Sequence, residues 1–257
     1  MKFLLILFYL FPTLAFSESL FSKDAVKKIL FLDYEFGQLE LLDQNVVVVL
    51  PENINAIQTD CTQARRGRCS QLTQIHPYPD YISQSAWRAE TNTMNFLPAR
   101  YSPGDHFVYR FSIKLADDWD LRLPKEGTSQ SVDIIWQFKR FNGPPDMFVA
   151  VKSGALVLRI SPSSQITLLP APLPLGRWID LEFDVHWAVD ERGEVDVLTK
   201  VHGQPDLKSH HLGPNLRNSR AQSGYLKWGL YMPDAQSEFT PRTVWHDAIE
   251  VLRIDGK

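Results

Sequence analysis

Apolar and polar residues alternate along most of the chain, which is the spacing of a β-strand with one buried face. The alternation is clearest over 107–115 and 179–187, where every second residue is a large apolar or aromatic one. Further strands are predicted at 131–139, 146–151, 155–160, 194–202, 224–232 and 243–254. Helical spacing occurs convincingly only near Lys23–Leu32, so one short helix is expected there.

Turn-forming residues separate the predicted strands. The chain has 17 prolines and 13 glycines, and Pro-rich connectors such as 170–174 have no strand or helix role of their own. Many short alternating strands between such turns predict an all-β fold. We expect an antiparallel two-sheet β-sandwich of jelly-roll type, in which a curved sheet can present one polar concave face.

The N-terminal residues have the order of a secretory signal. A lysine precedes an unbroken apolar run over 3–11, and the small residues Ala15 and Ser17 follow. We expect a signal peptide at 1–17 and a single domain at 18–257, because no repeat or linker interrupts the remainder. No segment approaches the roughly 20 apolar residues of a membrane span. The expectation is an exported protein, periplasmic or secreted, and monomeric.

Charge and cysteine usage narrow the partners. The net charge is −3 and the pI is near 6.2, so no basic field indicates a nucleic acid or an anionic membrane as a partner. A polyanionic ligand remains compatible with a local basic patch. Cys61 and Cys69 lie close together in a chain bound for an oxidising compartment, which favours a disulfide that closes a small loop. Two free thiols are the alternative.

The sharpest candidate for chemistry is the predicted strand 225–231. Side chains alternate across a strand, so Leu226, Trp228 and Leu230 should face the core. The other face carries Tyr225, Lys227, Gly229 and Tyr231. At about 3.3 Å per residue, Lys227 and Tyr231 lie roughly 13 Å apart, which leaves space over the glycine for a sugar ring.

A cation and a phenol in this arrangement suit β-elimination at a uronic acid. The reaction neutralises the substrate carboxylate, removes the C5 proton and protonates the departing glycosidic oxygen. A nearby cation such as Lys227 favours the phenolate form of a tyrosine. The same pair is also compatible with an ordinary solvated sheet face.

Several further segments occur in the order found in one known family. They are Asp33-Tyr34-Glu35, Arg65-Arg66-Gly67-Arg68-Cys69-Ser70, Trp87-Arg88-Ala89-Glu90, Trp136-Gln137-Phe138-Lys139 with Gly143-Pro144-Pro145, Leu175-Gly176-Arg177-Trp178, and Val244-Trp245-His246-Asp247. With the strand 225–231, they resemble the polysaccharide lyase family that includes heparin lyase I and the glucuronan lyases. The resemblance implies a concanavalin A-like β-jelly roll and an acidic polysaccharide substrate.

The resemblance also implies site residues. Lys227 and Tyr231 would belong to the active site, with Tyr231 in proton transfer, and Gln137 would help to neutralise the substrate carboxylate. The family often has a histidine as base two residues after that glutamine, whereas this chain has Lys139. An ammonium cannot remove a proton unless its pKa is strongly lowered. Tyr231 would then serve as both base and acid in a syn elimination, or His76 would supply the base.

The charged residues of two further segments are interpreted from their place on a strand. Arg88 and Glu90 share one strand face and form either a structural ion pair or part of the substrate wall, where the planar fork of Arg88 matches a carboxylate or sulfate. Asp247 resembles an acidic position in the closing strand of the family and is expected to be structural.

Two rival functions remain open from the sequence. Asp180, Glu182 and Asp184 occupy one strand face with roughly 6–7 Å between neighbours, which a glycoside hydrolase could use, although a solvent-facing strand has the same pattern. A non-catalytic, lectin-like carbohydrate-binding module is the second. No Gly-x-Ser-x-Gly elbow occurs. No cofactor is expected, His210-His211 is expected to be a loop pair rather than a metal site, and a structural calcium ion has no identifiable acidic loop.

Overall fold

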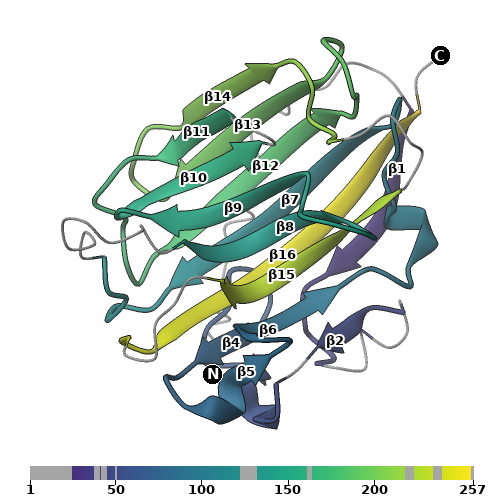
Figure 1. The fold of residues 1–257 in the computed structure, drawn as a ribbon. Coiled ribbons are helices and arrows are strands. Elements are labelled where there is room, and N and C mark those ends of the chain that lie inside the picture. The colour runs from purple at the N-terminus through teal and green to yellow at the C-terminus, as the bar shows by residue number, and fades with distance from the viewer. Residues whose placement is uncertain are drawn as a thin grey trace, which may run out of the picture.

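The computed structural model describes residues 25–37, 41, 45–49, 51–121, 132–160, 164–217, 223–233 and 239–255. Their strands form two eight-stranded antiparallel sheets packed face to face (Figure 1), as the alternation predicted. The predicted signal peptide at 1–17 lies outside the described residues. None of the helices within the described ranges is long and apolar enough to cross a membrane.

Sheet A contains both of the strands with the clearest alternation. In spatial order its strands are β14 (Leu207–Leu212), β13 (Glu194–Val201), β12 (Trp178–His186), β7 (His106–Leu115), β16 (Arg242–Asp255), β4 (Ser70–Ile75) and β3 (Ile57–Asp60), with β1 (Ala25–Leu32) also paired to β16. The first part of the long β16 pairs with β4 and the second part with β1. This 14-residue strand therefore pairs with β7 along one edge and with β4 and then β1 along the other.

Sheet B contains the strand that carried the sharpest sequence signal. In spatial order its strands are β11 (Ser164–Leu169), β10 (Ala155–Ile160), β9 (Met147–Lys152), β8 (Asp133–Arg140), β15 (Gly224–Met232), β6 (Ala86–Asn92) and β2 (Val47–Val49), with β5 (Ile82–Ser83) paired to β6. Three short 3-10 helices, η1 (Ile54–Ala56), η2 (Pro79–Tyr81) and η3 (Leu97–Ala99), lie between strands. The strands predicted from the sequence are all present.

Aromatic side chains between the sheets fix the register of β8 and β15. Trp136 of β8 is stacked on Phe111 of β7 with ring centroids 3.8 Å apart, and on Trp228 of β15 at 5.6 Å. All three side chains are almost fully buried. A slip of one residue would expose them and turn every polar neighbour inward, so the core determines which residues reach the outer face of sheet B.

Two predictions of local structure are wrong. Residues 25–32 form strand β1 rather than a helix. The extra residue Ile29 makes a β-bulge between Lys28 and Leu30 where β1 pairs with β16, and this bulge disturbs the period of two that marks a strand. His210 and His211 lie within β14, not in a loop, and their pairing with β13 is a long-range contact that local spacing does not reveal.

Candidate active site

The strand β15 lies between β8 and β6, so residues from three strands meet on the outer face of sheet B. Leu226, Trp228 and Leu230 are fully buried in the core, as predicted. On the other face Lys227 is opposite Gln137 of β8, and Tyr231 is opposite Arg88 of β6. The structure thus brings four of the predicted site residues onto one face.

Glu90 is the shared acceptor at the centre of this face. Its Oε1 accepts a hydrogen bond from Gln137 Nε2, and its Oε2 accepts one from Lys227 Nζ. Arg88 Nε lies 3.4 Å from the same Oε2. Glu90 and Gln137 are each 2% exposed and Lys227 is 8% exposed. A buried carboxylate therefore orients an amide and an ammonium, and compensates part of the charge of two cations.

Tyr231 is held against a cation and an apolar patch. The guanidinium carbon of Arg88 lies 4.1 Å from the centroid of its ring, which is cation–π geometry. Arg88 is anchored in turn, because its Nη1 donates to Gln84 Oε1 at 2.6 Å. The Tyr231 ring also packs against the small outer cluster formed by Ile134, Ala150 and Val157. The phenol is therefore restrained, although it is only partly buried.

The polar side chains on this face form a row that runs from Arg88 and Tyr231 through Glu90, Gln137 and Lys227. Lys139 and Tyr225 face each other at the other end of this row. Lys139 Nζ donates to the backbone oxygen of Arg140 at 3.1 Å and to that of Gly143. Burial lowers the pKa of Lys139, and the charges of Lys227 and Arg140 act in the same direction. Burial, followed by the charge of Glu90, raises the pKa of Tyr225. Both shifts favour the uncharged form of the side chain.

Gly229 is required by the backbone rather than by a gap for substrate. It lies at a β-bulge between Trp228 and Tyr231 with φ of 129°, a region that residues with a side chain rarely occupy. A Cβ there would lie 2.3 Å from the backbone oxygen of Ala89. Glu90 is opposite this glycine, so its carboxylate lies between Lys227 and Tyr231 along the strand.

None of the contacts that the structure shows for His76 is with a residue of this row. Within the described part of the chain its ring lies against Tyr81 at 5.2 Å and Tyr78 at 6.0 Å, beyond the end of β4. His76 stays a prediction as an alternative base and substrate contact.

The three carboxylates of β12 lie on the outer face of sheet A, in a different sheet from Lys227. Asp180 pairs with Arg65 at 2.8 Å, Glu182 with Arg110 at 2.7 Å, and Asp184 with His106 at 2.6 Å. Each has a partner from another segment, which is the pattern of a cross-linked sheet surface. These pairs favour the interpretation of the three carboxylates as an ordinary solvent-facing strand over that of a hydrolase acid and base.

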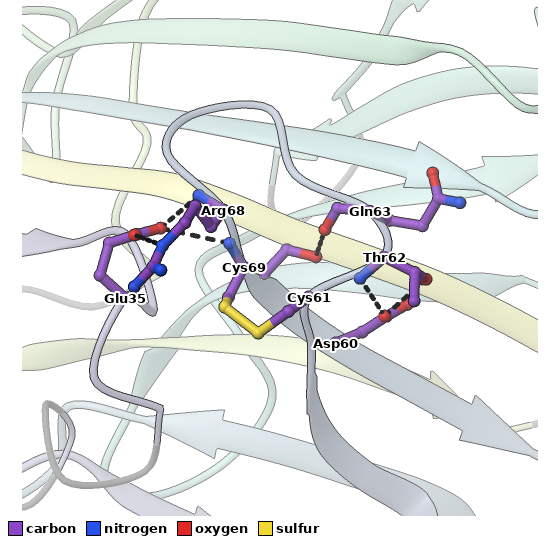
Figure 2. Close-up of a disulfide and its surroundings, with 8 residues drawn as sticks. Glu35, Asp60, Cys61, Thr62, Gln63, Arg68 and Cys69 are labelled. Carbon is purple, nitrogen blue, oxygen red and sulfur yellow. Dashed lines mark hydrogen bonds and ion pairs between the residues drawn. A yellow bond between two sulfur atoms is a disulfide. The ribbon is translucent and has the colours of Figure 1, made fainter.

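The disulfide between Cys61 and Cys69 is confirmed. Figure 2 shows how polar side chains hold its loop: Glu35 Oε1 accepts from the backbone N–H of Arg68 at 2.5 Å and of Cys69 at 3.2 Å. Ser70 Oγ donates to the backbone oxygen of Gln63 at 2.6 Å. The loop is therefore fixed by hydrogen bonds as well as by the covalent bond.

Asp247 anchors the same loop from β16, which supports the structural role expected for it. Its carboxylate accepts from the backbone N–H groups of Arg65 at 2.6 Å, Arg66 at 2.9 Å and Ala248 at 2.6 Å. Asp247 is fully buried, and burial raises its pKa to about 6 against the lowering effect of those three bonds.

The neighbouring His246 is fully buried on the core side. Its Nε2 lies 3.0 Å from the backbone oxygen of Ile135, which can only accept, so Nε2 carries the proton. Nδ1 has no partner among the described residues. Burial lowers the pKa of His246 to about 4, and the ring is neutral at pH 7.

The arrangement on sheet B can bind an anionic group and move a proton beside it. Lys227, Gln137, Lys139 and Arg88 supply donors, and Tyr231 supplies a hydroxyl group. Sequence reasoning missed the central place of Glu90, which it weighed only as the partner of Arg88. The two-residue spacing placed Glu90 on the correct face, but its bonds depend on β6 lying beside β15.

Comparison with solved structures shows the fold. The endo-β-1,4-glucuronan lyase from the fungus Trichoderma reesei is 15% identical, with a TM-score of 0.58 over 79% of this chain and 89% of that one. The PL-14 alginate lyase from Aplysia kurodai is 7% identical, with a TM-score of 0.56 over 88% and 99%. The alginate lyase A1-II', of polysaccharide lyase family 7, is 14% identical, with a TM-score of 0.55 over 81% and 95%.

Sequence comparison shows the family. None of the curated protein sequences matches the chain. A family model described as polysaccharide lyase matches residues 36–250, which include every residue of the row on sheet B. The chain belongs to the polysaccharide lyase family.

Proposed function

We propose that this lyase cleaves a uronic-acid-containing polysaccharide by β-elimination on the outer face of sheet B. One observation carries the proposal: donors suited to a carboxylate, Lys227 and Gln137, share a face with the restrained phenol of Tyr231. The product would carry an unsaturated sugar at the new non-reducing end. The glucuronan lyase and alginate lyases of the same fold support a uronate polymer as the substrate class.

Lys227 and Gln137 are proposed to hold the substrate carboxylate. Each gives one bond to Glu90, but an ammonium has three N–H donors and a primary amide has two. Donors therefore remain for a substrate. Arg88 and Lys139 are proposed to add positive charge at the two ends of the row, so that the negative charge building up at C5 and its carboxylate is stabilised.

Tyr231 is proposed to transfer the proton in both directions. Its phenolate takes the proton from C5, the electron pair forms the C4–C5 double bond, and the C4–O4 bond breaks. The same phenol then gives the proton to the departing O4, so that no proton is gained or lost overall. The guanidinium of Arg88 over the ring stabilises negative charge on it. No cofactor takes part in the proposed reaction.

A single tyrosine in both roles restricts the stereochemistry. One group reaches both atoms only when the C5 hydrogen and O4 lie on the same side of the ring, as they do in glucuronate and mannuronate but not in guluronate. We predict cleavage of glucuronan or polymannuronate and none of polyguluronate, followed by the ultraviolet absorbance of the unsaturated product. Cleavage of polyguluronate alone would contradict this assignment.

The direct test is Tyr231→Phe, which removes the hydroxyl and keeps the ring packed under Arg88. Turnover should be lost while binding to the polymer is retained, whereas the matched variant Tyr78→Phe, at a tyrosine that is 59% exposed, should keep both. Full turnover in Tyr231→Phe would refute its role. Binding without turnover in the wild-type protein on every uronate polymer would indicate a lectin-like module instead.

Export, a single domain at 18–257 and a monomeric state are also proposed. The apolar N-terminal run over 3–11 supports a cleaved signal, and the disulfide is of the kind that persists in an oxidising compartment. Intact mass of the protein recovered from periplasm and medium tests cleavage near Ser17, and light scattering tests the monomer.

A further inference from the structure

The outer face of sheet A holds a group of metal-ligating side chains remote from the row on sheet B. His106 at the start of β7 pairs directly with His186 at the end of β12, and Asp184 lies two residues before His186 on the same face. One ligand atom from each of the three lies within 4.8 Å of the others. In a tetrahedral site with bonds of 2.0–2.1 Å, ligand atoms are roughly 3.4 Å apart, so small side-chain rotations suffice.

The three carboxylates of β12 differ in their partners from one end of the strand to the other. On β12, Asp180 and Glu182 are bound by arginines, which cannot ligate a cation and would have to be displaced. Asp184 is bound by His106 at 2.6 Å, whose imidazole can itself be a ligand. A metal ion would replace this hydrogen bond without leaving an unpaired charge.

The adjoining strand adds negative charge. Asp196 of β13 pairs directly with Asp184, and Glu194 with His186. Within the described residues, both contact another histidine, His210, whose Nδ1 is 2.9 Å from Asp196 and 3.9 Å from Glu194. Three carboxylates thus lie together with histidines as their partners.

The two histidines of the first group lie close enough together to bind one ion. Their rings are stacked with centroids 3.6 Å apart. His186 is exposed and lines a surface depression with Asp105 and Arg192, so the site is open to solvent.

We propose that His106, Asp184 and His186 bind one divalent transition-metal ion of the zinc class, with a fourth position open to water or to Glu194. Two imidazole nitrogens and one carboxylate oxygen suit Zn²⁺, and also Co²⁺ or Ni²⁺, better than Ca²⁺ or Mg²⁺. The ion would join β7 to β12 and stabilise the sandwich. Because the site lies on the other sheet, this inference does not depend on the proposed reaction.

The test uses the full chain, stripped of metal with a chelator, and titrations with Zn²⁺ and Co²⁺. The wild-type protein should bind one Zn²⁺, gain thermal stability, and give the visible bands of a four-coordinate cobalt ion. His186→Asn should weaken binding at least about tenfold and abolish the gain in stability. His202→Asn, at an exposed histidine in the turn after β13, should change neither.

Three results would overturn the proposal. One is the absence of any Zn²⁺ binding by the wild-type protein. Another is equal binding by His186→Asn and wild type, which would mean scattered surface histidines. The third is loss of binding in His210→Asn but not in His186→Asn, which would assign the ion to β13 and β14. Since His186 is exposed, its replacement should fold, and a circular dichroism spectrum matching wild type checks this.

Discussion

The adjacent residues His246 and Asp247 should give opposite pH dependence to the stability of the fold. Both are fully buried. Burial lowers the pKa of His246 from 6.5 to about 4 and raises that of Asp247 from 3.8 to about 6. Each pKa unit between folded and unfolded states is worth about 1.4 kcal/mol, so each residue changes the free energy of unfolding by about 3 kcal/mol.

The two signs follow from which state binds the proton. Between pH 6.5 and 4 the unfolded chain protonates His246 while the folded chain does not, so stability due to His246 is lost as pH falls through 4. Between pH 3.8 and 6 the unfolded chain ionises Asp247 while the folded chain keeps it protonated, so its contribution is lost as pH rises through 6. Over pH 4 to 6 the two contributions nearly cancel.

Single substitutions should therefore reveal slopes that the wild-type protein conceals. In the Asp247→Asn variant the free energy of unfolding should rise by about 3 kcal/mol between pH 4 and pH 6, a rise that the wild-type protein lacks. The reason is that the titration of His246 is no longer offset by that of Asp247. His246→Gln, whose amide can still donate to Ile135, should make the free energy of unfolding fall by about the same amount. Urea unfolding followed by tryptophan fluorescence at pH 4, 5, 6 and 7 measures both.

The quantity compared is the change of the free energy of unfolding with pH, so a constant loss of stability caused by the substitution itself does not affect it. The double variant should recover the wild-type slope, and His202→Gln, at an exposed site, should not alter it. Wild-type slopes in both single variants would refute the claim that burial controls these two groups.

Three further sets of substitutions test the site and its loop. Gly229→Ala should destabilise the protein by at least about 2 kcal/mol, because of its positive φ and the backbone oxygen in the way; a smaller loss of the urea midpoint would contradict the bulge geometry. Glu90→Gln should lower kcat more than it changes KM, and with Lys227→Met it should show a coupling of about 1–3 kcal/mol in unfolding free energy, whereas additive effects would disprove the buried pair. Replacing Cys61 and Cys69 by serine should cost about 2–3 kcal/mol in thermal unfolding, as expected for a loop of this length, and no change would mean that hydrogen bonds alone hold the loop.

The sequence predicts the long strands well because burial of one face imposes a period of two over many residues. The shortest strands, β2, β3 and β5, have two to four residues, too few for a period to be seen. The bulge at Ile29 explains why β1 was mistaken for a helix. Local pattern therefore fails where a strand is short or its ladder is irregular.

The sequence predicts on which face of its strand each residue of the candidate site lies, but not which residues it contacts. Alternation alone placed Lys227 and Gln137 on outward faces, and the resemblance supplied Tyr231. The bonds of Glu90 depend on β6 lying next to β15 although more than 130 residues separate Glu90 from Lys227. The group formed by His106 and His186 is hidden for the same reason, since strand pairing rather than sequence spacing brings them together.

The net charge of −3 does not describe the surface that a polyanion would meet. On the described outer face of sheet B, the carboxylate of Glu90 lies among the cations Arg88, Lys227 and Lys139, so the row has excess positive charge. On sheet A the carboxylates of β12 gather on the opposite outer face. A face with excess positive charge attracts an acidic polymer, and because exposed charges are screened beyond about 8–10 Å in physiological salt, this attraction acts at close range. In the proposed reaction it would align a uronate with Lys227 and Tyr231.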